Sequence, residues 1–151
     1  MRLNVPASLQ EEHEHFHHCL EKCMHEPGAL GETAREVGRL LHLHCVSEEA
    51  IALPPLGLLA RVARGEITSD MAEVVQITRK LKAELPRMFA EHARIEAALE
   101  KMHAAAHLAR RPEYEQLAST LLLHAREEEE VLYPAAIVLG EYIADELAKR
   151  R

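Results

Sequence analysis

The sequence predicts an all-α protein, a four-helix bundle built from two tandem helical hairpins. Aromatic residues make up 3% of the chain, whereas the helix-forming residues Ala, Leu, Glu and Arg are abundant and Gly is sparse. The segment from His44 to Pro54 reappears eighty positions later, from His124 to Pro134, and both copies read His-x-x-x-Glu-Glu-x-[Ile/Val]-x-x-Pro. Such a repeat within 151 residues indicates one bundle made of two similar halves.

Local signals place the elements of the first half. A capping-box pattern, Ser8-Leu-Gln-Glu11, starts a first helix that ends near Pro27. A second helix covers about residues 30–53 and stops at Pro54. A short extra helix is expected after it, over about residues 54–66, and a matching short helix is expected at the C-terminus, over residues 134–149.

The second half begins with a long helix over about residues 68–107. Pro86 lies inside this stretch, and a proline in a helix interior removes one backbone hydrogen bond, so a kink or break is expected there. Pro112 suits the first position of the fourth main helix, which is expected to end before Pro134. The chain then reads as a single domain, residues 1–151, with internal repeats at about 8–66 and 87–149.

Charge and cysteine content restrict the setting. The formal net charge of −7 and a pI near 5.9 argue against nucleic acid or an anionic membrane as a partner. The N-terminus lacks the apolar run of a signal peptide, and no stretch approaches the roughly 20 apolar residues of a membrane span. Cys19, Cys23 and Cys45 are odd in number and form no Cys-x-x-Cys pair. A cytoplasmic protein without disulfides is therefore expected.

The repeated His-x-x-x-Glu motifs are the candidate chemistry. Within each motif, His44/Glu48 and His124/Glu128, the two side chains stand on the same helix face one turn apart. An isolated pair of this kind is usually a solvated ion pair, but both pairs here lie on apolar stripes that face a core. A buried carboxylate without a partner is costly, and a bound cation compensates that cost.

Single histidines on the other two helices complete the set. A Glu-His dipeptide on each of these helices matches His13 with His92, which selects His13 among the crowded histidines of the first helix. His17 and Glu96, which also correspond under the repeat, are two further candidates, either as ligands or as groups that hold the ligands in place. The predicted metal ligands are thus His13, His44, Glu48, His92, His124 and Glu128.

Other polar residues near these motifs receive different assignments. Glu49 and Glu129 follow the ligand carboxylates by one position, about 100° around a helix, which favours a supporting role or exposure to solvent. Tyr133 and Tyr114 are interpreted as packing residues rather than as hydrogen-bond donors to the site. Four histidines are expected at the surface or periphery, namely His25, His42, His103 and His107.

The donor set indicates the metal. Four imidazoles and two carboxylates without a thiolate fit a dinuclear iron centre, with manganese or zinc as substitutes, although zinc alone would be satisfied by four ligands. Ferritin-like di-iron bundles instead use Glu-x-x-His, with the acid before the base. The first helix contains that string, but His44 and His124 are preceded at that spacing by Leu41 and Leu121, so the order His then Glu favours a different bundle.

These residues resemble the pattern of the hemerythrin-like, or HHE cation-binding, family. The resemblance runs from about residue 8 to residue 143 and rests on the ligand set above together with the Tyr-Pro dipeptide after the second motif. It implies an up-down-up-down bundle holding a non-haem di-iron centre, with Glu48 and Glu128 bridging or chelating the irons. Oxygen-carrying hemerythrins have His-x-x-x-His on the third helix, whereas this chain has His-Ala-Arg-Ile-Glu from His92 onward, which argues against a simple oxygen-carrier role.

The resemblance implies a protein that binds or senses iron, oxygen or nitric oxide, with metal ions and a small diatomic molecule (O2 or NO) as partners. A di-iron oxidoreductase acting on peroxide, oxygen or nitric oxide is the alternative, because holding such a ligand and turning it over both need an open coordination position. A third hypothesis is a metal-free helical interaction module whose histidines are incidental. Whether the chain is an enzyme, and its oligomeric state, stay open at this point.

Overall fold

The computed structural model describes residues 1–150, and within this range the chain folds into helices without a β-strand. The elements in chain order are α1 (Ala7–Met24), α2 (Gly28–Ile51), η1 (Pro54–Leu58), α3 (Leu59–Ala63), η2 (Ser69–Met71), α4 (Ala72–Leu108), α5 (Pro112–Glu127), η3 (Glu128–Leu132) and α6 (Tyr133–Lys149). The elements η1 and η2 are 3-10 helices, and η3 is a π-helical turn. The predicted all-α class is confirmed, and a short helical segment does follow the second main helix.

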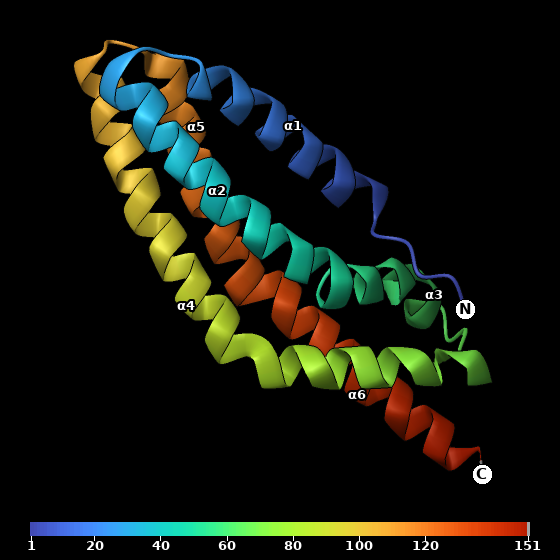
Figure 1. Cartoon of the computed structure of the whole chain (residues 1–151). Coiled ribbons are helices and arrows are strands. Elements are labelled where there is room, and N and C mark those ends of the chain that lie inside the picture. Colours follow the sequence, from blue (N-terminus) through green and yellow to red (C-terminus); the bar gives the residue numbers. More distant parts are fainter. Residues whose placement is uncertain (151) are drawn as a thin grey trace.

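The main helices pair as two hairpins. The turn between α1 and α2 and the turn between α4 and α5 lie at the same end of the molecule, and both chain termini lie toward the other end (Figure 1). Gly28 has a left-handed φ of 68° in the first turn, and Arg110 has a φ of 55° in the second. Pro112 lies in the first turn of α5, as expected for a residue that lacks an N–H. The result is a helical bundle.

The long helix α4 is bent but not broken. It runs for 37 residues with Pro86 inside it, and its yellow-green part bends so that the beginning of the helix crosses α6 (Figure 1). The proline lacks the N–H that would hold the helix straight at that point. At the crossing, a Cβ on Gly140 would lie 1.8 Å from Thr78 Oγ1, so the absence of a side chain allows the close approach.

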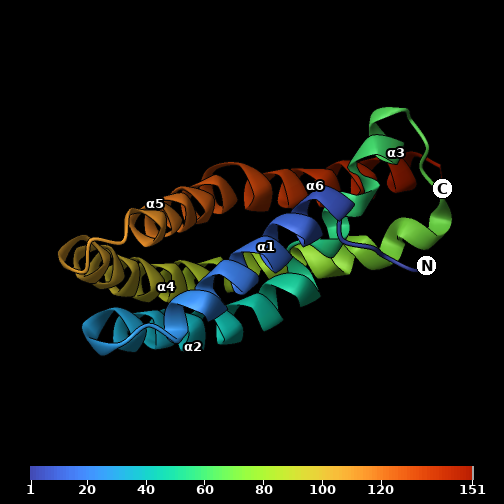
Figure 2. The same cartoon turned by 90° about the horizontal axis from the view of Figure 1, so that it is seen from above.

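Two helix ends differ in detail from the predictions. The helix α1 begins at Ala7, close to the predicted start, but Ser8 lies inside it without a side-chain capping hydrogen bond, and the φ of −52° at Pro6 already suits a helix start. The fourth helix, α5, ends at Glu127, before Pro134 as predicted, but the chain continues through η3 directly into α6 (Figure 2), where a proline in the first turn needs no N–H. The C-terminal helix therefore has 17 residues and is not short.

The interior is divided into apolar clusters with a polar layer between two of them. The first cluster lies among α1, α2, α4 and α5 and includes Phe16, and the second includes Tyr133. Side chains of the polar layer contact both clusters: the Phe16 ring centroid is 5.1 Å from that of His124, and the Tyr133 ring centroid is 5.8 Å from that of His92. The polar layer contains the predicted ligands.

Candidate metal centre

The structure brings the six predicted ligands together inside the bundle, and each exposes at most 8% of its surface. Five different elements supply them: His13 comes from α1, His44 and Glu48 from α2, His92 from α4, His124 from α5 and Glu128 from η3. Polar groups buried together at one level require partners, because each has given up its hydrogen bonds to water. Their mutual distances show what those partners are.

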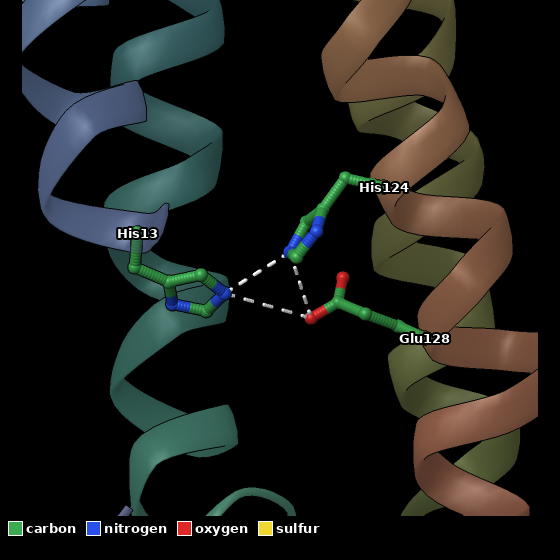
Figure 3. Close-up of side chains that lie close together, drawn as sticks. All are labelled: His13, His124 and Glu128. Atoms are coloured by element: carbon green, nitrogen blue, oxygen red, sulfur yellow. Dashed lines mark hydrogen bonds and ion pairs between the residues drawn. The ribbon is translucent and has the colours of Figure 1, made fainter. Parts of the chain in front are cut away.

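One imidazole pair joins α1 to α5. His13 Nε2 and His124 Nε2 are 3.0 Å apart, and Glu128 Oε2 lies 3.4 Å from His124 Nε2 and 4.0 Å from His13 Nε2. Figure 3 shows the three side chains converging from opposite sides of the bundle. Two donors at right angles, each about 2.1 Å from one ion, are about 3 Å apart. The two nitrogens therefore have the separation of neighbouring ligands on one ion.

A second imidazole pair joins α2 to α4. His44 Nε2 and His92 Nε2 are 2.8 Å apart, and Glu128 Oε1 lies 3.4 Å from His92 Nε2. The two oxygens of Glu128 thus face different imidazole pairs. Ligand atoms of His44, His92 and Glu128 lie within 4.8 Å of one another, as do those of the first group, so each group has the spacing that one ion requires.

Glu48 occupies a similar position on the other side of the site. Its Oε2 lies 4.0 Å from the Nε2 atoms of both His13 and His44, which belong to different pairs. Its Oε1 accepts a hydrogen bond from the Tyr133 hydroxyl at 3.0 Å. Both carboxylates are therefore located between the two imidazole pairs.

Burial shifts the protonation of these groups toward the neutral forms. It lowers the pKa of His13, His44 and His124 from 6.5 to about 4, and a neighbouring imidazole adds to the effect in each case. It also raises the pKa of Glu48 from 4.5 to about 8, partly opposed by the Tyr133 hydrogen bond. Neutral imidazoles are the form that binds metal. The carboxylate is the group that gains most from a nearby cation.

Glu128 Oε2 supplies an independent sign that a cation fits. Within residues 1–150, this buried oxygen has no hydrogen-bond partner. A desolvated carboxylate oxygen without a donor is strongly unfavourable, and a positive ion beside it removes the penalty. The position that such an ion would take is the one enclosed by His13, His124 and Glu128.

Further carboxylates contact the outward faces of the imidazoles. Glu91 Oε2 lies 3.2 Å from His44 Nδ1, and Glu129 Oε1 lies 3.0 Å from His92 Nδ1. With the Nδ1 proton directed at a carboxylate, the Nε2 lone pair is directed into the site and the ring orientation is fixed. The supporting role favoured for Glu129 agrees with this geometry. The contact of Glu91 with His44 was not predicted from the sequence.

The same arrangement recurs beside the first imidazole pair. Glu12 Oε1 lies 2.7 Å from His124 Nδ1, although the two groups are not aligned as a hydrogen bond. The signal for Glu12 and Glu91 was present in the Glu-His dipeptide that recurs in the sequence, since the first residue of each dipeptide contacts an imidazole of a neighbouring helix. Glu49 is exposed to solvent, which was one of the two alternatives predicted for it.

The π-helical turn brings Tyr133 to the site. The Tyr133 N–H donates to the Glu128 carbonyl, and the matching residue of the first repeat, Leu53, donates in the same way to Glu48. The Tyr133 hydroxyl lies 3.2 Å from His44 Nε2 as well as 3.0 Å from Glu48 Oε1. The packing role predicted for Tyr133 is therefore incomplete, because its phenol donates to a ligand.

The two further candidates lie outside the cluster. His17 is exposed on α1 and lines a small hollow beside His13, and Glu96 is half-buried and, within residues 1–150, shares no group of potential ion ligands. Cys45 was not predicted to lie at the site, yet it lines the same hollow, and burial raises the pKa of its thiol to about 12. The peripheral histidines are exposed at His25, His42 and His107 and half-buried at His103.

Comparisons with known proteins give no relatives. No protein-family model matches the chain, and neither a curated protein nor a solved structure matches it. Across residues 1–150, none of the helices combines the length and apolar character needed to cross a membrane. The assignment of function therefore rests on the site itself.

Proposed function

We propose that the chain is a non-haem di-iron binding protein of the hemerythrin-like type, with an up-down-up-down bundle around the centre, that binds or senses iron, oxygen or nitric oxide. The observation that carries this proposal is the position of Glu128. Its Oε1 lies 3.4 Å from His92 Nε2, and its Oε2 lies 3.4 Å from His124 Nε2. A carboxylate that faces two imidazole pairs in this way suits two ions, one beside each pair.

The donor set supports iron or manganese. One ion would be held by His13, His124 and Glu128, and the other by His44, His92 and Glu128, with Glu48 near both positions. The six proposed ligands are imidazoles and carboxylates, which favour these metals over softer ones. The Cys45 sulfur also lies within 4.8 Å of ligand atoms of His13 and Glu48, but burial raises the pKa of this thiol to about 12. Bound iron would supply an open coordination position and a change of oxidation state, which diatomic ligands require.

The chain itself contributes orientation and exclusion of water. The outward carboxylates Glu91 and Glu129 fix the rings that they contact. A hollow of about 30 Å³ beside the first imidazole pair is walled on its apolar side by Phe16, Leu41 and Leu121. That volume accommodates about one or two small molecules, so a diatomic ligand fits and a larger substrate does not.

A di-iron oxidoreductase is the second candidate, and Tyr133 is the observation that favours it. Its hydroxyl lies 3.2 Å from His44 Nε2 and 3.4 Å from His92 Nε2. A phenol in that position would be able to donate a proton to a molecule bound at an ion held by His44 and His92. Consumption of peroxide over many turnovers would support this candidate over simple binding.

Metal analysis of the purified protein, with visible spectra before and after oxygen, peroxide and nitric oxide, tests the proposal. We expect about two iron or manganese equivalents per chain, because the six predicted ligands offer one group of donors beside each imidazole pair, His13/His124/Glu128 and His44/His92/Glu128. Glu128→Ala should lower this number, whereas Glu130→Ala, at an exposed position in the same turn, should not. Zinc alone, a single bound ion, or equal loss in both variants would contradict the dinuclear centre.

A further inference from the structure

Two hollows meet at His13. The inner one, of about 30 Å³, is bounded by ligand side chains that include His124 and Glu128. The outer one is a surface cleft of about 300 Å³, lined by residues that include Gln10, Glu14 and Glu49. His13 and His17 line both hollows, so the two adjoin at these imidazoles. We call the outer hollow the access cleft.

The inner hollow contains a carboxylate oxygen that lacks a hydrogen-bond partner among the described residues. Glu128 Oε2, in a side chain 3% exposed, has no hydrogen-bond partner within residues 1–150 and lies 4.0 Å from His13 Nε2. A cation that reached His13 Nε2 would therefore be about 4 Å from a buried carboxylate oxygen that has no hydrogen-bond partner in the described part of the chain. Binding at that point would remove the desolvation penalty of the carboxylate, which draws the ion inward.

The mouth of the access cleft has the chemistry of a temporary cation site. Glu14, His17 and Glu49 are all exposed and line it together. Glu49 is close enough to His13 for its charge to oppose the lowering of the His13 pKa, which burial mainly causes. Exposed carboxylates at the opening of a cleft raise the local concentration of cations and the rate at which they enter.

Other approaches to the centre are less suitable. On the α2/α4 side, Arg87 forms ion pairs with Glu84 and Glu91, so a positive charge lies beside the carboxylate that contacts His44. On the α5 side, Glu127 and Glu12 lie near His124, but Glu12 contacts the outward Nδ1, so the imidazole ring itself separates an ion there from the centre.

We propose that divalent cations load the centre through the access cleft, with Glu49 and His17 as a transient station from which the ion passes to His13. The inference rests on the proposed metal-binding function, and it assigns to Glu49 and His17 a role in the rate of loading rather than in the final complex. His17 is then neither a permanent ligand nor an idle surface residue.

The test is the rate of metal uptake by the full chain. Protein stripped with a chelator is mixed with Co²⁺ in a stopped-flow instrument, and the visible absorption of the bound ion is followed, with metal stoichiometry measured at the end. We expect Glu49→Gln and His17→Asn each to slow loading by about threefold to tenfold and to leave the final stoichiometry unchanged. The matched control, Glu127→Gln, should load at the parental rate. Added salt should slow the parent more than the Glu49 variant.

The possible outcomes distinguish failure of the proposed loading route from failure of the proposed metal centre. Parental loading rates in both variants, or equal slowing in Glu127→Gln, would overturn the route while the centre stands. Loss of one metal equivalent in His17→Asn would also overturn it, since His17 would then be a permanent ligand. A parent protein that binds no Co²⁺ and no Fe²⁺ would refute the proposed function itself, and the route with it.

Discussion

Replacing Glu48 with glutamine should stabilise the metal-free protein while weakening its binding of metal. Burial raises the pKa of Glu48 from 4.5 to about 8, so the unfolded chain releases this proton at lower pH than the folded chain does. Each pH unit above 4.5, up to about 8, then costs the folded state about 1.4 kcal/mol. At pH 7 the cost is about 3 kcal/mol, and it falls below about 1 kcal/mol at pH 5.

Glutamine avoids this cost without leaving a gap. Its amide oxygen can accept the Tyr133 hydrogen bond that Glu48 Oε1 accepts now, and its amide nitrogen would face the Nε2 atoms of His13 and His44. The change also removes one of the two carboxylates that lie between the imidazole pairs. We therefore expect Glu48→Gln to lose metal although the apo protein gains stability.

The assay is urea denaturation of chelator-treated protein at pH 7 and pH 5, with metal content measured separately. Parent and variant share the same histidines, so the difference between them isolates Glu48. Glu49→Gln is the matched control, and as an exposed neighbour it should change stability by less than about 0.5 kcal/mol. A metal-free Glu48→Gln protein less stable than the parent at pH 7, or equally stabilised at both pH values, would refute the reasoning.

Three further outcomes are expected. His13→Ala should impair metal loading about as much as His92→Ala, whereas His15→Ala, at an exposed position of α1, should load fully; metal analysis showing the reverse for the two α1 variants would move the ligand to His15. Tyr133→Phe should destabilise the metal-free protein by about 1–2 kcal/mol in urea, because a buried carboxylate oxygen loses its donor, and unchanged stability would contradict that hydrogen bond. The metal-free protein should also lose thermal stability as pH falls from 6.5 to about 4, since three buried histidines stay neutral in the folded state while the unfolded chain takes up protons. The metal-bound form should be less sensitive over that range, and equal sensitivity would contradict shared burial of the ligands.

The sequence was sufficient to choose six residues that the structure buries together, because the information needed was local. A His and a Glu four residues apart share a helix face wherever the helix goes, as His44 and Glu48 do. The repeat then matched His13 with His92 without knowledge of how helices pack. For the same reason the all-α class was predictable from composition and periodicity.

The features that were missed depend on contacts between helices or on a change of helical phase. In an ideal α-helix, Tyr133 would stand about 140° around from Glu128, facing away from the ligand. In the π-helical turn the Tyr133 N–H bonds to the Glu128 carbonyl, which brings both side chains to the same face of the helix. No pattern of residue types predicted this turn. Glu91 on α4 contacts His44 on α2. The spacing of residues within one helix does not predict such a contact between two helices.

Each imidazole pair takes one ring from each half of the chain: His13 pairs with His124, and His44 pairs with His92. A single half therefore supplies only one ring of each pair, and a separate hairpin of half this length could assemble both pairs only as a symmetric dimer. Such a dimer would carry the same residue at the position that is Leu53 in one half and Tyr133 in the other. Because both halves lie in one chain, one half can place a phenol beside the site while the other keeps an apolar side chain there.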